Sequence, residues 1–312
     1  FKLKMQGATF IMKAEELKTI VVIGAGAMGQ QIAMNTAIKG RKSGYQVKLC
    51  DSVPAALERA SQWAESYLAG RVAKGRLTQE QADEVKDNLT ITQDVDGAVE
   101  QADLVVEAII EKLDAKRELF GRISKICRPD TVLATNSSNI VSSKLADVTE
   151  HPERLLNIHY FNPALVMELV EIVRGPHTGD AAVEVAKTFA VNTGKSPIVL
   201  KKEIAGFVAN RINAAVAHEA LSLLEKGIAS VEDIDTACEK GLNYPMGPFR
   251  LMDLTGIDVN YYVRVDRFAE SQDPFDAPHP LVVEKFKRGE FGKKTGKGWY
   301  DYSDHKQTEK KS

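Results

Sequence analysis

Polar side chains in this sequence come directly after buried-looking apolar segments, where they could take part in proton transfer. They are Asn136, Ser137 and Ser138 after TVLAT (131–135), His159 at the end of LLNIH (155–159), and Glu168 and Glu171 on opposite faces of MELVEIV (167–173). A histidine that takes a proton near pH 7, with a carboxylate to orient it, is what alcohol oxidation by hydride transfer requires. Taken alone, however, His159 could be a hydrogen-bonded structural residue, Ser138 a helix cap and Glu171 a solvated strand residue.

A glycine-rich segment indicates what would accept the hydride. VVIGAGAMGQQIA (21–33) changes from a strand-like run to a helix-like pattern through Gly24, Gly26 and Gly29. This is the context of the dinucleotide fingerprint, in which the glycines permit a tight turn, approach of the pyrophosphate and close packing of helix on strand. Asp51 ends the next apolar run, 22 residues after Gly29, where an acid would bind the adenosine ribose and favour NAD over NADP. The plainer alternative is a glycine turn with a surface aspartate.

The elements around these residues alternate between short apolar runs and amphipathic stretches. We expect strands at 19–24, 46–51, 103–109, 131–135, 155–159, 167–173 and 196–200, with helices between most of them, such as 112–126 and 180–192. Strand–helix alternation of this kind predicts a parallel sheet covered by helices on both faces. The fold class is therefore α/β, a Rossmann-type doubly wound sheet, followed by an all-α C-terminal domain.

Two stretches depart from that alternation. Residues 53–87 form two polar helical segments, the second opened by Thr78 and Gln81 as a capping box. Beyond residue 201 only helical patterns remain: one with apolar positions from Phe207 to Leu224 that ends at Gly227, and one from Ser230, capped with Asp233, to Gly241. We expect a first domain at 13–200, with the insertion at 53–87, and a helical domain at 201–312. Its apolar positions indicate a dimer interface, the alternative being that they simply form the core of this domain.

Composition sets wider limits. The 312 residues are 44% hydrophobic and carry a net charge of −2, which gives no indication of nucleic acid or of an anionic membrane as partner. Three dispersed cysteines, at positions 50, 127 and 238, fit a reduced compartment, so we expect a cytoplasmic protein without a metal site. The first residues carry no signal-peptide pattern, and we interpret 1–12 as a remnant before a native start at Met12.

Taken together, the motifs identify a family. The chain resembles the L-3-hydroxyacyl-CoA dehydrogenases, particularly the short-chain 3-hydroxybutyryl-CoA type, from about residue 18 to 303. The resemblance is carried by GAGAMG, LVVEAIIEKLDAKRELF, ATNSSNI, HYFNPALVMELVEIV, GFVANR, YPMGPFRLMDLTGID and FGKKTGKGWYDY. It implies NAD-dependent oxidation of L-3-hydroxyacyl-CoA to 3-ketoacyl-CoA and the reverse reduction, an acyl-CoA substrate, a role in fatty-acid β-oxidation and a homodimer formed through the C-terminal domain.

The resemblance also assigns site residues. It implies the catalytic residues His159, Glu171, Ser138 (rather than Ser137) and Asn210, the cofactor contacts Gly24, Gly26, Ala27, Met28, Gly29, Asp51, Glu111, Lys116, Asn162 and Lys294, and the substrate contacts Ser66, Lys74 and Ser138. In this interpretation His159 removes the 3-hydroxyl proton while Glu171 orients its ring. The insertion corresponds to the acyl-CoA-binding hairpin, where Arg71, Lys74 and Arg76 would receive phosphates unless they are simply a solvated face.

The chain departs from the family pattern in two places, and both bear on acyl specificity. The serine motif N-T-S-[ST] has Ser137 and Asn139 at its second and fourth positions, and the proline before G-F-x-x-N-R is Ala205. The rival interpretations are a sugar-acid dehydrogenase of the same fold and a non-catalytic, crystallin-like nucleotide-binding protein.

Overall fold

The computed structural model describes residues 13–303 and divides into two compact units between Phe207 and Val208. The expectation that residues 1–12 precede the native start lies outside the described residues.

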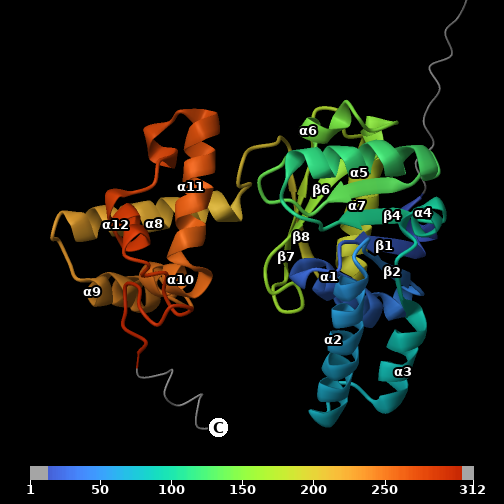
Figure 1. The fold of residues 1–312 in the computed structure, drawn as a ribbon, viewed down its shortest axis with the longest axis horizontal. Helices are drawn as coiled ribbons and strands as arrows, with labels where there is room; N and C mark the ends of the chain where they lie inside the picture. Colours follow the sequence, from blue (N-terminus) through green and yellow to red (C-terminus); the bar gives the residue numbers. More distant parts are fainter. Residues whose placement is uncertain (1–12, 304–312) are drawn as a thin grey trace, which may run out of the picture. The chain divides into compact units, whose positions relative to one another are not determined.

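The first unit is built on one eight-stranded sheet with the order β3-β2-β1-β4-β5-β6-β7-β8 (Figure 1). Its strands are β1 (Thr19–Ile23), β2 (Gln46–Cys50), β3 (Leu89–Thr92), β4 (Leu104–Glu107), β5 (Val132–Thr135), β6 (Leu155–Tyr160), β7 (Leu169–Val173) and β8 (Ser196–Leu200). This arrangement confirms the Rossmann-type fold, in which ligands bind beyond the carboxyl ends of the strands.

Helices cover both faces of the sheet because successive strand side chains point to opposite sides. Ile20 and Val22 of β1 belong to one hydrophobic cluster, and Val21 and Ile23 belong to the other. The first cluster takes in α1 (Ala27–Lys39) and α7 (Asp180–Asn192), and the second takes in α4 (Val95–Glu100), α5 (Leu113–Ile126) and α6 (Ser143–Ala146). Short 3-10 turns lie at Ala14–Glu16, Gly40–Ser43 and Pro152–Arg154.

The sheet differs from the sequence expectation at two strands. β3 was not expected, because its four residues follow a helix directly and lie half-buried at the sheet edge. The expected parallel sheet is confirmed except at one pair, because β7 pairs with β6 antiparallel. The connection at 161–168 is too short to hold the crossover helix that a parallel pair needs, so the chain turns straight back.

The insertion is a helical hairpin of α2 (Pro54–Ala73) and α3 (Gln79–Asn88) that extends away from the sheet (Figure 1). Thr78 and Gln81 form the expected capping box, with each side chain bonded to the other residue's backbone N–H at 3.1 Å. The turn between the helices is therefore fixed by local chemistry.

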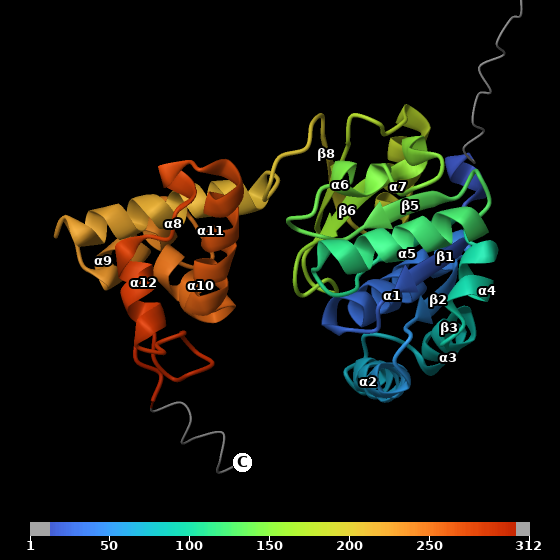
Figure 2. The same ribbon diagram turned by 45° about the horizontal axis from the view of Figure 1, so that its top comes forward.

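The second unit is helical, and Figure 2 shows its helices from another side. Its elements are α8 (Ala209–Glu225), α9 (Val231–Thr236) continued by a π-helical turn (Ala237–Gly241), α10 (Pro248–Thr255), α11 (Ile257–Ser271), a 3-10 turn (Pro274–Asp276) and α12 (Pro280–Lys287). α8 begins at Ala209 rather than at Phe207, because Gly206 and Phe207 both have positive φ. No helix described between residues 13 and 303 is long and apolar enough to cross a membrane.

Two buried carboxylates join the motifs YPMGPFRLMD and GKGWYDY. Asp235 accepts hydrogen bonds from the first N–H groups of α10 and from the Tyr300 hydroxyl, and Asp253 accepts from the backbone of Trp299 and Tyr300. A Cβ at Gly298 would lie 2.0 Å from the Asp253 carboxylate, so only glycine fits there. The two motifs, although distant in sequence, therefore pack against each other in the second unit.

A buried lysine holds the β6–β7 connection. Lys195, just before β8, donates to the carbonyl oxygens of Ala164 at 2.5 Å and Met167 at 2.8 Å. Its side chain is 8% exposed, and burial, together with the charge of Lys39, lowers the pKa of its ammonium. The connection is thus tied to the far edge of the sheet.

Lys195→Met should lower the free energy of unfolding of the first unit by about 1–3 kcal/mol, because two carbonyls lose their donor. The free energy of unfolding is measured by urea titration, with Trp63 fluorescence as the signal in a Trp299→Phe background. Lys187→Met, a variant of a lysine outside this contact, is the matched control.

The same variant predicts a pH dependence. Because the pKa of Lys195 is lower in the folded than in the unfolded protein, the unfolded chain binds the Lys195 proton more tightly. The stability difference between wild type and Lys195→Met should therefore grow as pH rises from the folded towards the unfolded pKa. Equal stability of the two lysine variants would contradict the assignment.

Candidate active site

The glycine loop between β1 and α1 has the geometry of a dinucleotide site. Gly24 has φ +108°, and a Cβ there would lie 2.5 Å from the carbonyl oxygen of Ala108. A Cβ on Gly29 would lie 1.7 Å from the Gly24 oxygen, whereas one on Gly26 would meet nothing within 4 Å. The loop is therefore closely packed at two glycines and open at the third, which is where a pyrophosphate needs room.

A cavity of about 790 Å³ lies on this loop. It is lined by Gly24, Ala25, Gly26 and Ala27, by Asp51 after β2, by Arg59 and Trp63 of α2, and by Ala108, Ile109 and Ile110 after β4. α1 starts at the cavity without a side-chain cap, so its first N–H groups are available to an anion. The residues present fit NAD: an open anion-binding helix end, apolar walls and one carboxylate.

Asp51 is held in place by both of its oxygens. One accepts from the N–H of Ala25 at 2.7 Å, and the other accepts from the N–H of Val53 at 2.9 Å. The carboxylate thus joins the glycine loop to the start of the hairpin, at the end of the strand where a ribose would be bound.

His159, Glu171 and Ser138 are brought together in one chain of hydrogen bonds. Antiparallel pairing places His159 opposite Glu171, with Nδ1 2.8 Å from the carboxylate. Ser138 Oγ, from the loop after β5, lies 2.9 Å from Nε2. A carboxylate accepts only, so Nδ1 donates to it, and the neutral ring keeps its lone pair on Nε2, towards Ser138. The histidine is arranged as a base on the Ser138 side.

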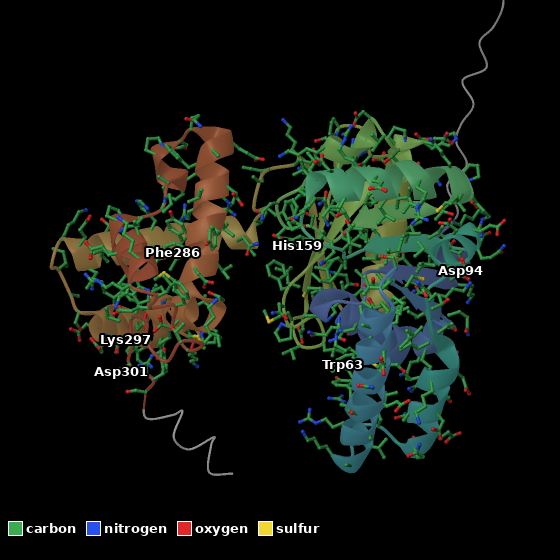
Figure 3. The ribbon with its side chains drawn as sticks, viewed as in Figure 1. Trp63, Asp94, His159, Phe286, Lys297 and Asp301 are labelled. Carbon is green, nitrogen blue, oxygen red and sulfur yellow. The ribbon has the colours of Figure 1, made fainter. Side chains whose placement is uncertain are left out.

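The surroundings of the imidazole are almost dry. His159 is 3% exposed and Glu171 is fully buried. The rings of Phe161 and Phe207 stand edge-on to the imidazole, with centroids 4.6 Å and 5.2 Å away. Figure 3 labels His159 in this part of the first unit. Electrostatic interactions and hydrogen bonds are strong in such a low-dielectric environment, so the carboxylate fixes the orientation of the ring effectively.

The two adjacent serines have different surroundings. Ser137 is buried; its Oγ bonds to Glu111 and accepts from the N–H of Ile140 at 2.7 Å. Asn157 of β6 supports the same loop through the carbonyls of Ser137 and Ile140. Ser137 therefore shapes the turn, and Ser138 is the serine whose hydroxyl reaches the histidine.

A buried ion pair, not foreseen from the sequence, supports both loops. Lys116 of α5 is 1% exposed and lies 2.5 Å from the fully buried Glu107 and 3.3 Å from Glu111. Glu107 also accepts from the N–H of Ile109 and the hydroxyl of Thr135. The network runs from the wall of the cofactor cavity to the serine loop. Glu107 and Asn157 could be recognised in advance only as polar residues inside apolar strands.

The remaining site residues implied by the resemblance are distributed over the chain. Met28 is half-buried in the first turn of α1, and Asn162 is exposed just after β6. Ser66 is exposed on α2, and Lys74 is exposed where that helix ends. Asn210 lies at the start of α8 and Lys294 pairs with Asp258 at 2.6 Å, both in the second unit. Their roles stay predictions.

A Glu–His–Ser chain by itself also occurs in serine hydrolases, where the serine is a nucleophile. The neighbouring features decide between the two chemistries here. The serine loop and the cavity on the glycine loop lie at the carboxyl ends of β5 and β1, and the Glu107–Lys116 network connects them. A sheet and site of this kind define an NAD-dependent oxidoreductase.

Family models match nearly all of the described chain. The 3-hydroxyacyl-CoA dehydrogenase NAD binding domain matches residues 19–204, and the 3-hydroxyacyl-CoA dehydrogenase C-terminal domain matches residues 206–302. The chain belongs to the 3-hydroxyacyl-CoA dehydrogenase family.

Individual relatives match along nearly their whole length. The chain is 34% identical over 290 residues to a 3-hydroxybutyryl-CoA dehydrogenase of Mycobacterium tuberculosis (strain ATCC 25618 / H37Rv), covering 93% of this chain and 100% of the relative. It is 36% identical over 294 residues to the mitochondrial hydroxyacyl-coenzyme A dehydrogenase of Sus scrofa, covering 92% and 91%. The crystal structure of (S)-3-hydroxybutyryl-CoA dehydrogenase PaaH1 from Ralstonia eutropha has a TM-score of 0.85 at 34% identity, covering 92% and 99%.

Replacing each serine in turn should show that Ser138 acts in catalysis and that Ser137 stabilises the turn. Ser138→Ala should lower kcat/KM for NADH-dependent reduction of a 3-ketoacyl-CoA by about 10²-fold, as when a donor to developing charge is removed, with unfolding little changed. Ser137→Ala should instead lower the free energy of unfolding by about 1–3 kcal/mol, because the Ile140 N–H loses its acceptor. The opposite pattern would reverse the two assignments.

Proposed function

We propose that this protein interconverts L-3-hydroxyacyl-CoA and 3-ketoacyl-CoA with NAD, with the four-carbon 3-hydroxybutyryl-CoA as its substrate. The observation that carries the proposal is the Glu171–His159–Ser138 chain at the same sheet edge as the cavity on the glycine loop. The two relatives named for 3-hydroxybutyryl-CoA support the acyl length.

In the oxidising direction, His159 Nε2 accepts the proton of the substrate 3-hydroxyl. Glu171 keeps the ring in the tautomer whose lone pair is on Nε2 and stabilises the imidazolium that forms. Ser138 hydrogen-bonds the substrate oxygen beside Nε2, and Asn210 is proposed to hold the same end of the substrate, a positioning effect. Phe161 and Phe207 keep water from the ring. NAD, when bound, supplies the hydride acceptor.

The cofactor roles proposed for Glu111, Lys116, Asn162 and Lys294 rest on the family resemblance. For Lys116 the observed contacts support an indirect role, because its ammonium is bonded to Glu107 and Glu111 and is 1% exposed. It would act by fixing the loop that carries Ile109 and Ile110 against the cofactor.

We propose a homodimer formed through the helical unit. Its support is a set of exposed apolar side chains on α8, on the residue before it and on α11: Val208, Ile212, Val259, Tyr262, Val265 and Phe268. An apolar set of this size on a monomer commonly marks an interface. Sedimentation equilibrium of the full chain measures the state directly, and a monomer would overturn the proposal.

We also propose a cytoplasmic location and a role in fatty-acid β-oxidation. All three cysteines are free, and burial raises the pKa of Cys50 to about 12 and that of Cys127 to about 11, which suits thiols that stay reduced. Fractionation of the source cells followed by immunoblotting tests the location. Growth of a deletion strain on fatty acids tests the role.

Steady-state kinetics test the activity itself. The substrates are 3-ketoacyl-CoA thioesters of four to sixteen carbons with NADH or NADPH, with L-gulonate and NAD for the sugar-acid alternative. Release of free coenzyme A serves as the readout for a hydrolase. Turnover of acetoacetyl-CoA with NADH is expected. Turnover of L-gulonate alone would identify a sugar-acid dehydrogenase, and thioester hydrolysis alone would identify a hydrolase. Cofactor binding without any turnover would identify a non-catalytic nucleotide-binding protein.

His159 and Glu171 should act as one unit. His159→Ala and Glu171→Gln are each expected to lower kcat by at least about 10²-fold while NADH still binds, the lower range for a general base. Because the glutamate works through the imidazole, the double variant should be little worse than the worse single variant. Multiplicative losses would show that Glu171 has a separate role, and near-normal kcat in His159→Ala would remove the mechanism.

Asp51 should set the preference for NADH over NADPH, because its carboxylate repels a 2′-phosphate at the ribose. Asp51→Ser is expected to lower the ratio of kcat/KM with NADH to kcat/KM with NADPH, mainly by lowering KM for NADPH. The matched control is Asp94→Ser, a nearby helix cap whose carboxylate does not line this cavity. A wild-type enzyme that already prefers NADPH would contradict the role of Asp51.

A further inference from the structure

The exit segment (201–207) connects the end of β8 to Phe207, whose ring packs against the imidazole of His159. It belongs to no helix or strand, so no backbone ladder holds it. The N–H of Phe207 donates to the carbonyl oxygen of Ile204 at 3.0 Å, which makes the last four residues a turn. The position of the Phe207 ring therefore depends on what holds the start of this turn.

The residue directly before the turn, Glu203, is bound to another part of the first unit. One oxygen of its carboxylate accepts from the Ser142 hydroxyl at 2.7 Å and from the N–H of Ser143 at 2.9 Å. Both donors lie at the start of α6, 60 residues earlier in the chain. Hydrogen bonds to an ionised acceptor are roughly twice as strong as neutral ones. Glu203 thus attaches the exit segment firmly.

Gly175, in the loop after β7, leaves the space in which this attachment forms. A Cβ on Gly175 would lie 2.8 Å from Ser142 Oγ, 2.9 Å from Glu203 Oε1 and 2.4 Å from Cε1 of His177. Gly175 does not have a positive φ, so its backbone would accept other residues. What the position requires is room for the three neighbouring side chains.

An apolar contact lies beside the polar one. Val141, the residue before Ser142, packs against the cluster that Phe207 forms with apolar side chains of β7 and β8. The N–H of Ser142 donates to Asn157 at 2.9 Å, and the Asn157 amide donates to two carbonyls of the serine loop (137–142). Asn157 lies two residues before His159 on β6. The serine loop therefore has its own anchor on the strand of the base, and Glu203 attaches the exit segment to that loop.

We propose that Glu203 is a positioning residue for proton transfer: it holds the exit segment against the serine loop, so that Phe207 stays on the imidazole of His159 and keeps water from it. The proposal rests on the proposed function and adds a residue outside the Glu171–His159–Ser138 chain. If the carboxylate is removed, two donors lose their acceptor, and the exit segment should open from the serine loop more often.

Chemical labelling measures the shielding of His159 without substrate or cofactor. Diethyl pyrocarbonate modifies accessible neutral imidazoles, and the tryptic peptide 155–174 contains His159 as its single histidine. Glu203→Ala should raise the labelling rate of this peptide by about 5- to 100-fold, the increase in opening that loss of a buried acceptor supports. The exposed His151, in the peptide 145–154, calibrates the reagent.

Three further variants identify the cause of a change in labelling. Glu203→Gln keeps an oxygen that can accept from both donors and should keep the wild-type rate. Gly175→Ala leaves Glu203 in the chain but places a methyl group against its carboxylate, and should raise the rate as Glu203→Ala does. Glu184→Ala removes an exposed carboxylate of α7 and, as the matched control, should leave the rate unchanged.

Kinetics connect the shielding to the reaction. Glu203→Ala should lower kcat for oxidation of L-3-hydroxybutyryl-CoA by about 10- to 100-fold, as a small displacement around the reacting atoms does. It should leave KM for NAD unchanged, because Glu203 does not line the cofactor cavity. In a Phe207→Ala background the same substitution should have little further effect on kcat, because Glu203 acts through that ring.

Each outcome decides the proposal. An unchanged labelling rate in Glu203→Ala would overturn it, and so would multiplicative losses of kcat in Glu203→Ala combined with Phe207→Ala. Equal exposure of His159 in Glu203→Gln and Glu203→Ala would also overturn it, because the hydrogen bonds would not be what holds the segment. If the labelling follows the expected pattern but the wild-type protein oxidises no 3-hydroxyacyl-CoA, the attachment stands and the proposed function has failed.

Discussion

The antiparallel pairing of β6 with β7 is the constraint on which the site depends. It places His159 and Glu171 directly opposite one another, so their side chains emerge on the same face within hydrogen-bond distance. A shift of one residue would send one of them to the other face of the sheet. The contact between His159 and Glu171 therefore depends on the register of β6 with β7. The surrounding strands and the Lys195 contacts to the β6–β7 connection maintain this register.

The buried Glu107–Lys116 pair plays a different part, because it organises loops rather than strands. Removing two charges from water is unfavourable unless their remaining hydrogen-bonding capacity is used, and here Ile109 and Thr135 complete the Glu107 carboxylate while Glu111 approaches Lys116. The result is one polar connection beneath both the cofactor wall and the serine turn. An apolar replacement of similar volume could match its stability but would not hold two loops in fixed relation.

Local chemistry explains which features the sequence could predict. The glycine turn, the acid that ends β2, the capping box of Thr78 with Gln81 and the helical second unit each depend on residues close together in the chain. The edge strand β3 is defined by its pairing with β2, a distant segment that periodicity does not report. The direction of β7 follows from the short connection at 161–168, and the pairing of Lys116 with Glu107 and Glu111 depends on how the chain turns between β4 and α5, so neither was visible in strand or helix periodicity. The choice of Ser138 over Ser137 came from the family resemblance. Its physical basis is visible only in the fold, where Ser137 is occupied by the turn and Ser138 faces the imidazole.

Phe207 is both a neighbour of the catalytic histidine and the last residue of the first unit. Its ring packs against the imidazole of His159, and its backbone, like that of Gly206, has positive φ directly before the second unit begins. A bulky residue in that conformation is held there by its packing, at some cost in backbone energy. The covalent joint between the units thus starts at the residue that shields the base. The strained backbone and the shielding of the proton acceptor therefore depend on one and the same residue.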